Sequence, residues 1–162
     1  MDSQIRTATV HELKDELQQL PPAKVVELCI RLSRFKKENK ELLTYLLFES
    51  HNMEAYLELV KQDTTNLFTE VNSTNLYFAK KTIRKILRLI NKQIRFTGSK
   101  QAEAELLTHY CTCLKNSGIP FQKSNALLNL YKQQLKKIEK AVEGLHEDLQ
   151  YEYQKELSKL QL

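Results

Sequence analysis

Apolar residues recur every three or four positions along most of this 162-residue chain, which is the spacing of an amphipathic helix. Only three glycines and three prolines occur, so few positions can form the tight turns that β-hairpins and phosphate-binding loops require. The pattern therefore predicts an all-α fold. We expect about six or seven helices, arranged either as an irregular, solenoid-like helical repeat or as a bundle.

The first half of the chain contains four helical segments. Two prolines separate the periodic runs at 10–20 and 22–35, where they stop the first helix and open the second. Residues 41–50 are apolar on nearly all sides, which predicts a central helix that is the most buried element. A further segment at 53–71 carries a polar stretch in its middle, where we expect a kink or a break.

The segment 76–96 divides into two faces when it is placed on a helix of about 100° per residue. One arc is apolar and is expected to face the core; it contains Leu76, Ala79, Ile83, Ile86, Leu87, Ile90 and Ile94. The other arc holds six cations, with a seventh, Lys80, at its edge. We call these seven the basic face: Lys80, Lys81, Arg84, Lys85, Arg88, Lys92 and Arg95. We expect Ser73 or Thr74 to cap this helix, and Thr97-Gly98-Ser99 to end it and cap the next.

The basic face has no acidic residue near it in the sequence, since no Asp or Glu occurs between Val71 and Ala102. Ion pairs at helical spacings of three or four are therefore impossible within this segment. One interpretation is that the cations contact the phosphates of a nucleic acid. The other is that they are solvated, or that they dock against the acidic stretch from Glu139 to Glu156.

The last segment, from Gln122 to about Leu160, has the heptad spacing of a helical seam. The seam contains Leu128, Tyr131, Leu135, Ile138, Val142, Leu145 and Leu149. A single helix of this length would span about 58 Å, so it must project, break near Gly144, or pair with another chain. We expect a compact helical part at 1–120 and this long C-terminal helix at 121–162, packed on it or projecting, within one domain.

Residues that could carry chemistry are scattered. His109 and Cys113 share a helical face, while Cys111 points elsewhere, and no second Cys/His cluster completes a metal site. Glu143 and His146 have the spacing of a metal-binding helix bundle, but only one such pair exists. The glycine-poor connections offer no nucleophile turn and no phosphate loop. We therefore expect no enzyme activity, no cofactor and no metal.

The composition favours a cytoplasmic protein that binds macromolecules. No apolar run reaches the roughly 18–20 residues that cross a bilayer, so no membrane partner is expected, and three cysteines do not form a disulfide framework. The leading prediction is a non-enzymatic intracellular interaction or scaffold protein, which binds a protein partner or itself through the seam. The alternative is a nucleic-acid-binding protein that uses residues 80–95, in keeping with a net charge of +5.

Overall fold

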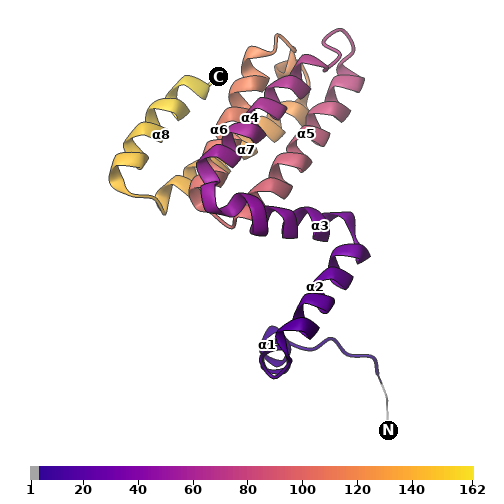
Figure 1. Ribbon diagram of the computed structural model, residues 1–162. Helices are drawn as coiled ribbons and strands as arrows, with labels where there is room; N and C mark the ends of the chain where they lie inside the picture. The colour runs from indigo at the N-terminus through magenta and orange to yellow at the C-terminus, as the bar shows by residue number, and fades with distance from the viewer. Residues whose placement is uncertain (1–3) are drawn as a thin grey trace. The chain divides into compact units, whose positions relative to one another are not determined.

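The computed structural model describes residues 4–162, and it is all-α over that range, which confirms the predicted fold class (Figure 1). The chain forms two compact units. The N-terminal unit ends at Leu47, and the C-terminal unit runs from Phe48 to Leu162. The helices on either side of residue 120 pack against each other, and both lie in the C-terminal unit.

The N-terminal unit contains α1 (Val10–Gln18), α2 (Pro22–Phe35) and α3 (Lys37–Thr44). Thr9 and Glu12 form a capping box at the start of α1, and the Arg6 guanidinium lies 2.8 Å from the Glu12 carboxylate. These contacts, with the hydrogen bond from Arg6 first, lower the pKa of Glu12 to about 2. These local contacts fix the start of α1.

The apolar stretch at 41–50 is not the most buried element. It ends α3 at Thr44 and continues as a π-helical turn, Tyr45–Glu49, in which Leu46, Leu47 and Phe48 are exposed. An all-round apolar pattern predicts burial only where other elements enclose the helix. In residues 4–47 only Ser33 and Tyr45 are buried, so this unit has no enclosed apolar core.

The C-terminal unit packs five helices around one core: α4 (Met53–Thr69), α5 (Leu76–Thr97), α6 (Lys100–Asn116), α7 (Asn125–Glu143) and α8 (Glu147–Leu160). Short 3₁₀ turns at Ser50–Asn52 and Phe121–Lys123 precede α4 and α7. Helix α6 is central, because it packs against each of the other four (Figure 1). Its Leu106, Leu107, Tyr110 and Leu114 are almost fully buried.

Helix α4 is continuous, although the polar stretch in its middle suggested a kink. Thr64 and Thr65 direct their hydroxyls to the carbonyl oxygens of Val60 and Lys61, at 2.8 and 3.0 Å. Threonine hydroxyls that bond back to the preceding turn are satisfied without breaking the helix. Thr64 is buried, so this face of α4 belongs to the core.

The C-terminal segment breaks at Gly144, which was one of the three expected outcomes. Helix α7 ends there, and His146 caps α8, which packs on α6 and α7. The buried Tyr131 hydroxyl donates to the Leu160 carbonyl at 2.6 Å. The Lys115 ammonium donates to the carbonyls of Lys159 and Gln161. These bonds satisfy carbonyls at the end of α8, which helices otherwise leave without partners.

Candidate nucleic-acid interface

Helix α5 begins and ends through local side-chain and backbone contacts. The Asn75 side chain, rather than Ser73 or Thr74, accepts from the N–H groups of Tyr77 and Phe78. At the other end Gly98 adopts the left-handed conformation, with φ of 60°, and its N–H donates to the Ile94 carbonyl. Glycine adopts this conformation without steric cost, so the helix stops where the sequence indicated.

The apolar face of α5 supplies one wall of the core. Ile83, Ile86 and Ile90 are at most 2% exposed, and Ala79 and Leu87 are also buried. The Tyr110 hydroxyl of α6 donates to the Ile83 carbonyl at 3.0 Å, which fixes the two helices at this point. Helix α5 therefore cannot rotate to hide its cations without removing these isoleucines from the core.

The basic face lies on the opposite side of α5. Lys81, Arg84, Lys85, Arg88 and Arg95 are exposed, whereas Lys80 and Lys92 are partly buried. Within residues 4–162, Lys80 and the five exposed cations form no ion pair with a carboxylate. Five neighbouring cations without carboxylate partners create a positive potential that attracts anions.

The acidic C-terminal helix does not cover the basic face. Helix α8 packs on α6 and α7, and Figure 1 shows α5 and α8 on opposite sides of the C-terminal unit. In α8 the Glu156 carboxylate pairs with Lys159 at 3.0 Å, on its own helix. The basic face therefore does not dock against α8, which was one of the interpretations of the sequence.

An aromatic pair extends the basic face at its N-terminal end. Tyr77 and Phe78 are exposed, and their ring centroids are 5.5 Å apart. The Lys81 ammonium lies over the Tyr77 ring, 4.6 Å from its centroid. Tyr77 precedes Arg84 and Arg88 by seven and eleven residues, which are whole numbers of helical turns to a close approximation. That spacing was readable in the sequence, but the tyrosine was not singled out there.

The C-terminal seam packs inside the chain. Tyr131, Leu135, Ile138 and Val142 are buried in the core of the C-terminal unit, where α7 packs on α6, and the remaining members, Leu128, Leu145 and Leu149, are partly buried. The face with the heptad pattern thus lies at a contact between helices of the same chain. Its main partner is α6 of the same chain, which leaves little of the seam free for another molecule.

A polar cleft of about 500 Å³ lies between α4 and α6. It is lined by Glu58, Lys61, Gln62, Thr65, Asn66 and His109. The His109 Nε2 atom is 2.9 Å from the Thr65 hydroxyl, 3.0 Å from the Lys61 carbonyl and 3.4 Å from the Cys113 thiol. The Lys61 ammonium bridges Glu58 and Glu105, at 2.8 and 2.6 Å.

The ionisation of this cleft does not favour nucleophilic chemistry. Burial lowers the pKa of His109 and raises the pKa of Cys113, and a hydrogen bond between Cys113 and Thr65 offsets only part of the rise in the Cys113 pKa. A reactive cysteine needs the opposite arrangement, with a thiolate stabilised by a charged imidazole. Across residues 4–162 no group of three His, Cys, Asp or Glu side chains is placed to hold a metal ion.

Acidification should destabilise the C-terminal unit through His109. Because burial lowers its folded-state pKa, the unfolded chain takes up a proton near pH 6.5 while the folded chain stays neutral. The stability contributed by the neutral imidazole is complete above about pH 6.5 and is lost as the pH falls through the folded-state pKa. We expect the urea midpoint to fall between pH 7.5 and 5.5, and the fall to be smaller in His109→Gln. The exposed His11→Gln variant should retain the full dependence; the same dependence in all three proteins would refute the assignment.

Comparison with protein families, with curated proteins and with solved structures finds no match for this chain. In the part of the chain that the structure describes, no helix is both long and apolar enough to cross a membrane. Function therefore has to be argued from the surfaces of the two units.

Proposed function

We propose that this protein is a non-enzymatic binding protein that contacts the phosphates of a nucleic acid through the basic face of α5. The observation that supports the proposal is the division of α5 into buried isoleucines on one side and five exposed cations without ion-pair partners on the other. Lysines and arginines in such a row can neutralise consecutive phosphates. We expect the protein to work in the cytoplasm, which fits its three free thiols.

The dimensions of the basic face suit a nucleic-acid strand. From Lys80 to Arg95 the helix advances about 22 Å at 1.5 Å per residue. Phosphates of one strand follow each other every 3.4 Å along the axis of a duplex, so this length matches about seven of them. The cations project along the whole of that length, and the central Arg84 and Arg88 are the contacts we expect to matter most.

Reversing two charges at the centre of the face tests the proposal. We expect Arg84→Glu/Arg88→Glu to weaken binding of a fluorescently labelled 20-nucleotide strand at least tenfold, measured by anisotropy at 50 mM salt. The double variant Lys132→Glu/Lys136→Glu is the matched control, because both lysines are exposed on α7. Each double variant changes the net charge of +5 by four units, to +1.

The control separates a localised interface from general attraction. Equal losses in the two double variants would mean that net charge alone causes binding, and the proposal would then be wrong. Absence of any binding by the unaltered protein at low salt would also overturn it. Helical circular dichroism should be the same in all three proteins, since every substituted side chain is exposed.

Tyr77 points to single-stranded nucleic acid as the preferred ligand. Proteins that bind single strands combine a cationic groove with aromatic rings on which bases stack, at about 1–3 kcal/mol per base. We expect Tyr77→Ala to weaken single-strand binding roughly 5- to 150-fold and duplex binding far less. Tyr151→Ala is a matched control, because Tyr151 is equally exposed and also lies under a lysine, Lys155, at 4.3 Å, but on α8. An equal effect on both ligands would argue against stacking.

A further inference from the structure

The N-terminal unit has formed helices but almost no core of its own. Its three helices are 9, 14 and 8 residues long, and isolated helices of this length are marginal in water. Helices in proteins gain most of their stability from burial of an apolar face. In residues 4–47 the only buried side chains are Ser33 and Tyr45, so that contribution is nearly absent within the unit.

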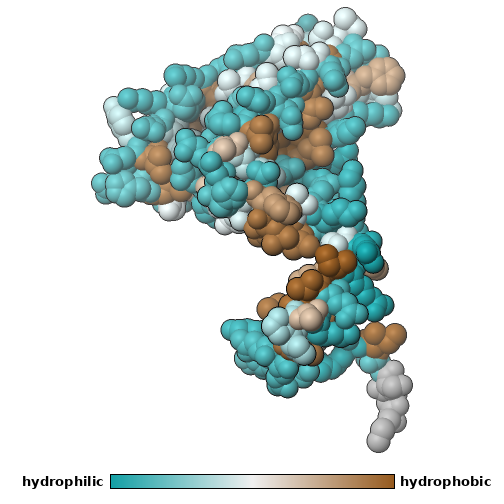
Figure 2. Space-filling model, in the orientation of Figure 1, coloured by the Kyte–Doolittle hydropathy of each residue, from teal (hydrophilic) through white to brown (hydrophobic). Residues whose placement is uncertain are grey.

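Apolar side chains are instead displayed on the surface of this unit. Six that are more than 40% exposed lie on α2 and on the segment from α3 to the π-helical turn: Val26, Ile30, Leu32, Phe35, Leu46 and Leu47. Figure 2 shows hydrophobic side chains at the surface along α2 and α3. Three more exposed apolar residues lie on α1. Large exposed apolar patches on a monomer mark interaction sites.

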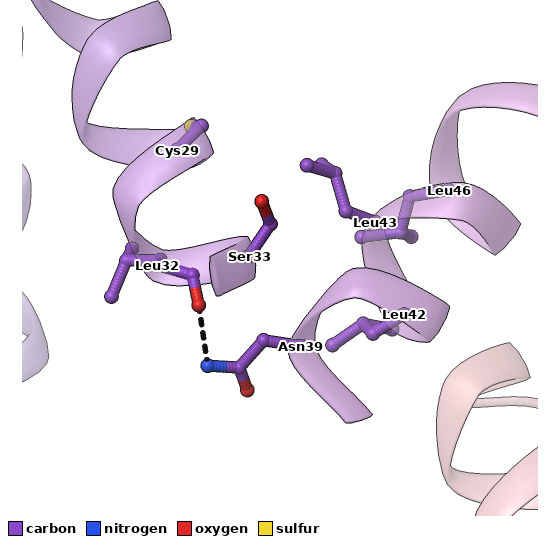
Figure 3. Close-up of a pocket in the computed structure, with 7 residues that line it drawn as sticks. All are labelled: Cys29, Leu32, Ser33, Asn39, Leu42, Leu43 and Leu46. Atoms are coloured by element: carbon purple, nitrogen blue, oxygen red, sulfur yellow. Dashed lines mark hydrogen bonds between the residues drawn. The ribbon is translucent and has the colours of Figure 1, made fainter. Parts of the chain in front are cut away.

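Helices α2 and α3 enclose an apolar groove of about 240 Å³ within this surface (Figure 3). The groove is lined by Cys29, Leu32, Ser33, Asn39, Leu42, Leu43 and Leu46. The Asn39 side chain donates to the Leu32 carbonyl at 2.8 Å, which ties the start of α3 to the end of α2 and shapes the groove. Ser33 donates to the Ile30 carbonyl, so its hydroxyl is already satisfied and leaves the groove apolar.

The charges of this unit are separated along the chain. Helix α1 carries three acids, Glu12, Asp15 and Glu16, against one lysine. The stretch 31–40 carries five cations, Arg31, Arg34, Lys36, Lys37 and Lys40, against one acid. Within residues 4–162, Arg31, Arg34, Lys36 and Lys40 form no ion pair. A surface that is acidic at one end and basic at the other is complementary to an inverted copy of itself.

We infer that the N-terminal unit is a homodimerisation element, in which α2 packs antiparallel to α2 of a second copy across the apolar groove. This arrangement brings the acidic α1 of each copy to the basic stretch 31–40 of the other. Exposed apolar side chains on one side of α2, with those of its neighbouring helices, supply the apolar part of such an interface, which in a standard complex covers about 800 Å² per partner. Two-fold self-complementarity of this kind is the usual geometry of a dimer.

The arrangement places one thiol near the two-fold axis. Helix α2 runs from Pro22 to Phe35, so Cys29 lies beside its midpoint, and it is exposed in the groove. In an antiparallel pair of helices the two midpoints face each other at an interaxial distance of about 8–10 Å. The other thiols, Cys111 and Cys113, are buried and partly buried in the C-terminal unit. Only Cys29 should therefore join two chains.

The state of association of the full-length chain tests the inference. Sedimentation velocity should give twice the chain mass of 19.0 kDa at micromolar concentration. We expect Leu32→Glu to raise the dimer dissociation constant at least 100-fold. The matched control Leu59→Glu replaces a leucine on α4 that is also about half exposed, and it should leave the dimer intact. Circular dichroism should report folded protein for both variants, because neither leucine is buried.

Two further measurements test the antiparallel geometry. A short bismaleimide should crosslink the unaltered dimer covalently, and Cys29→Ser should abolish the crosslink without changing the dimer. Arg34→Glu should weaken the dimer at least fivefold, and adding Glu16→Lys should restore it. A monomer at all concentrations would overturn the inference. Three other results would also overturn it. The dimer could remain intact in Leu32→Glu, or the crosslink could persist in Cys29→Ser. The third is that Glu16→Lys fails to restore the dimer in the Arg34→Glu variant.

Discussion

Ile83→Ala should lower the free energy of unfolding of the C-terminal unit by about 3 kcal/mol, whereas Arg84→Ala next to it should change it by less than about 0.5 kcal/mol. Ile83 is fully buried against the core, so shortening it removes buried apolar surface and leaves a cavity. Arg84 is exposed and has no carboxylate partner within residues 4–162. Its removal also relieves repulsion between like charges, which is worth a few tenths of a kcal/mol.

Urea unfolding, monitored by circular dichroism, measures both changes in the free energy of unfolding. In binding measurements on the same two proteins, Arg84→Ala should have the larger effect. At a temperature where Ile83→Ala is folded, it should bind nucleic acid as the unaltered protein does, while Arg84→Ala should bind more weakly. Such opposite effects of two adjacent substitutions on stability and on affinity would establish that one face of α5 stabilises the fold and the other binds the ligand. Similar losses of stability for the two substitutions would mean that α5 is not oriented as described.

The two-faced character of α5 could be recognised from the sequence because it depends on one helix alone. A period of 3.6 residues places Ile83, Ile86 and Ile90 together whatever surrounds them, and the structure buries all three. The N-cap was missed by one or two residues, since Asn75 and not Ser73 or Thr74 accepts the first N–H groups. All three residue types are good caps, so composition alone could not choose among them.

Helical periodicity could not predict which partner covers an apolar face. The heptad seam at Tyr131 and Ile138 has the same period whether the second helix belongs to the same chain or to another one. Here Gly144 ends α7, and the turn after it lets α8 pack back on α6 and α7, so the core of one unit takes up the seam. Residues 41–50 are the reverse case, in which an apolar pattern suggested enclosure that the N-terminal unit does not provide.

Contacts between segments that are distant in the sequence could not be predicted from the sequence either. His109 and Cys113 are four residues apart and could be placed on one face from the sequence. Thr65 and Lys61, which complete the cleft, lie on α4, more than forty residues earlier. Their approach follows from the packing of α4 on α6, and that packing depends on side-chain shapes along both helices.

Salt should weaken nucleic-acid binding steeply if the five exposed cations of the basic face each contact a phosphate. For a single strand the expected slope of log affinity against log salt concentration is about −0.7 per contact, or about −3.5 for five contacts. Affinity should then fall roughly 130-fold between 50 and 200 mM salt. In Arg84→Glu/Arg88→Glu the slope should shrink to about −2, because two contacts are lost. The Lys132→Glu/Lys136→Glu control should keep the full slope. A slope near zero in the unaltered protein would show that phosphates are not the ligand, since counterion release accompanies every phosphate contact.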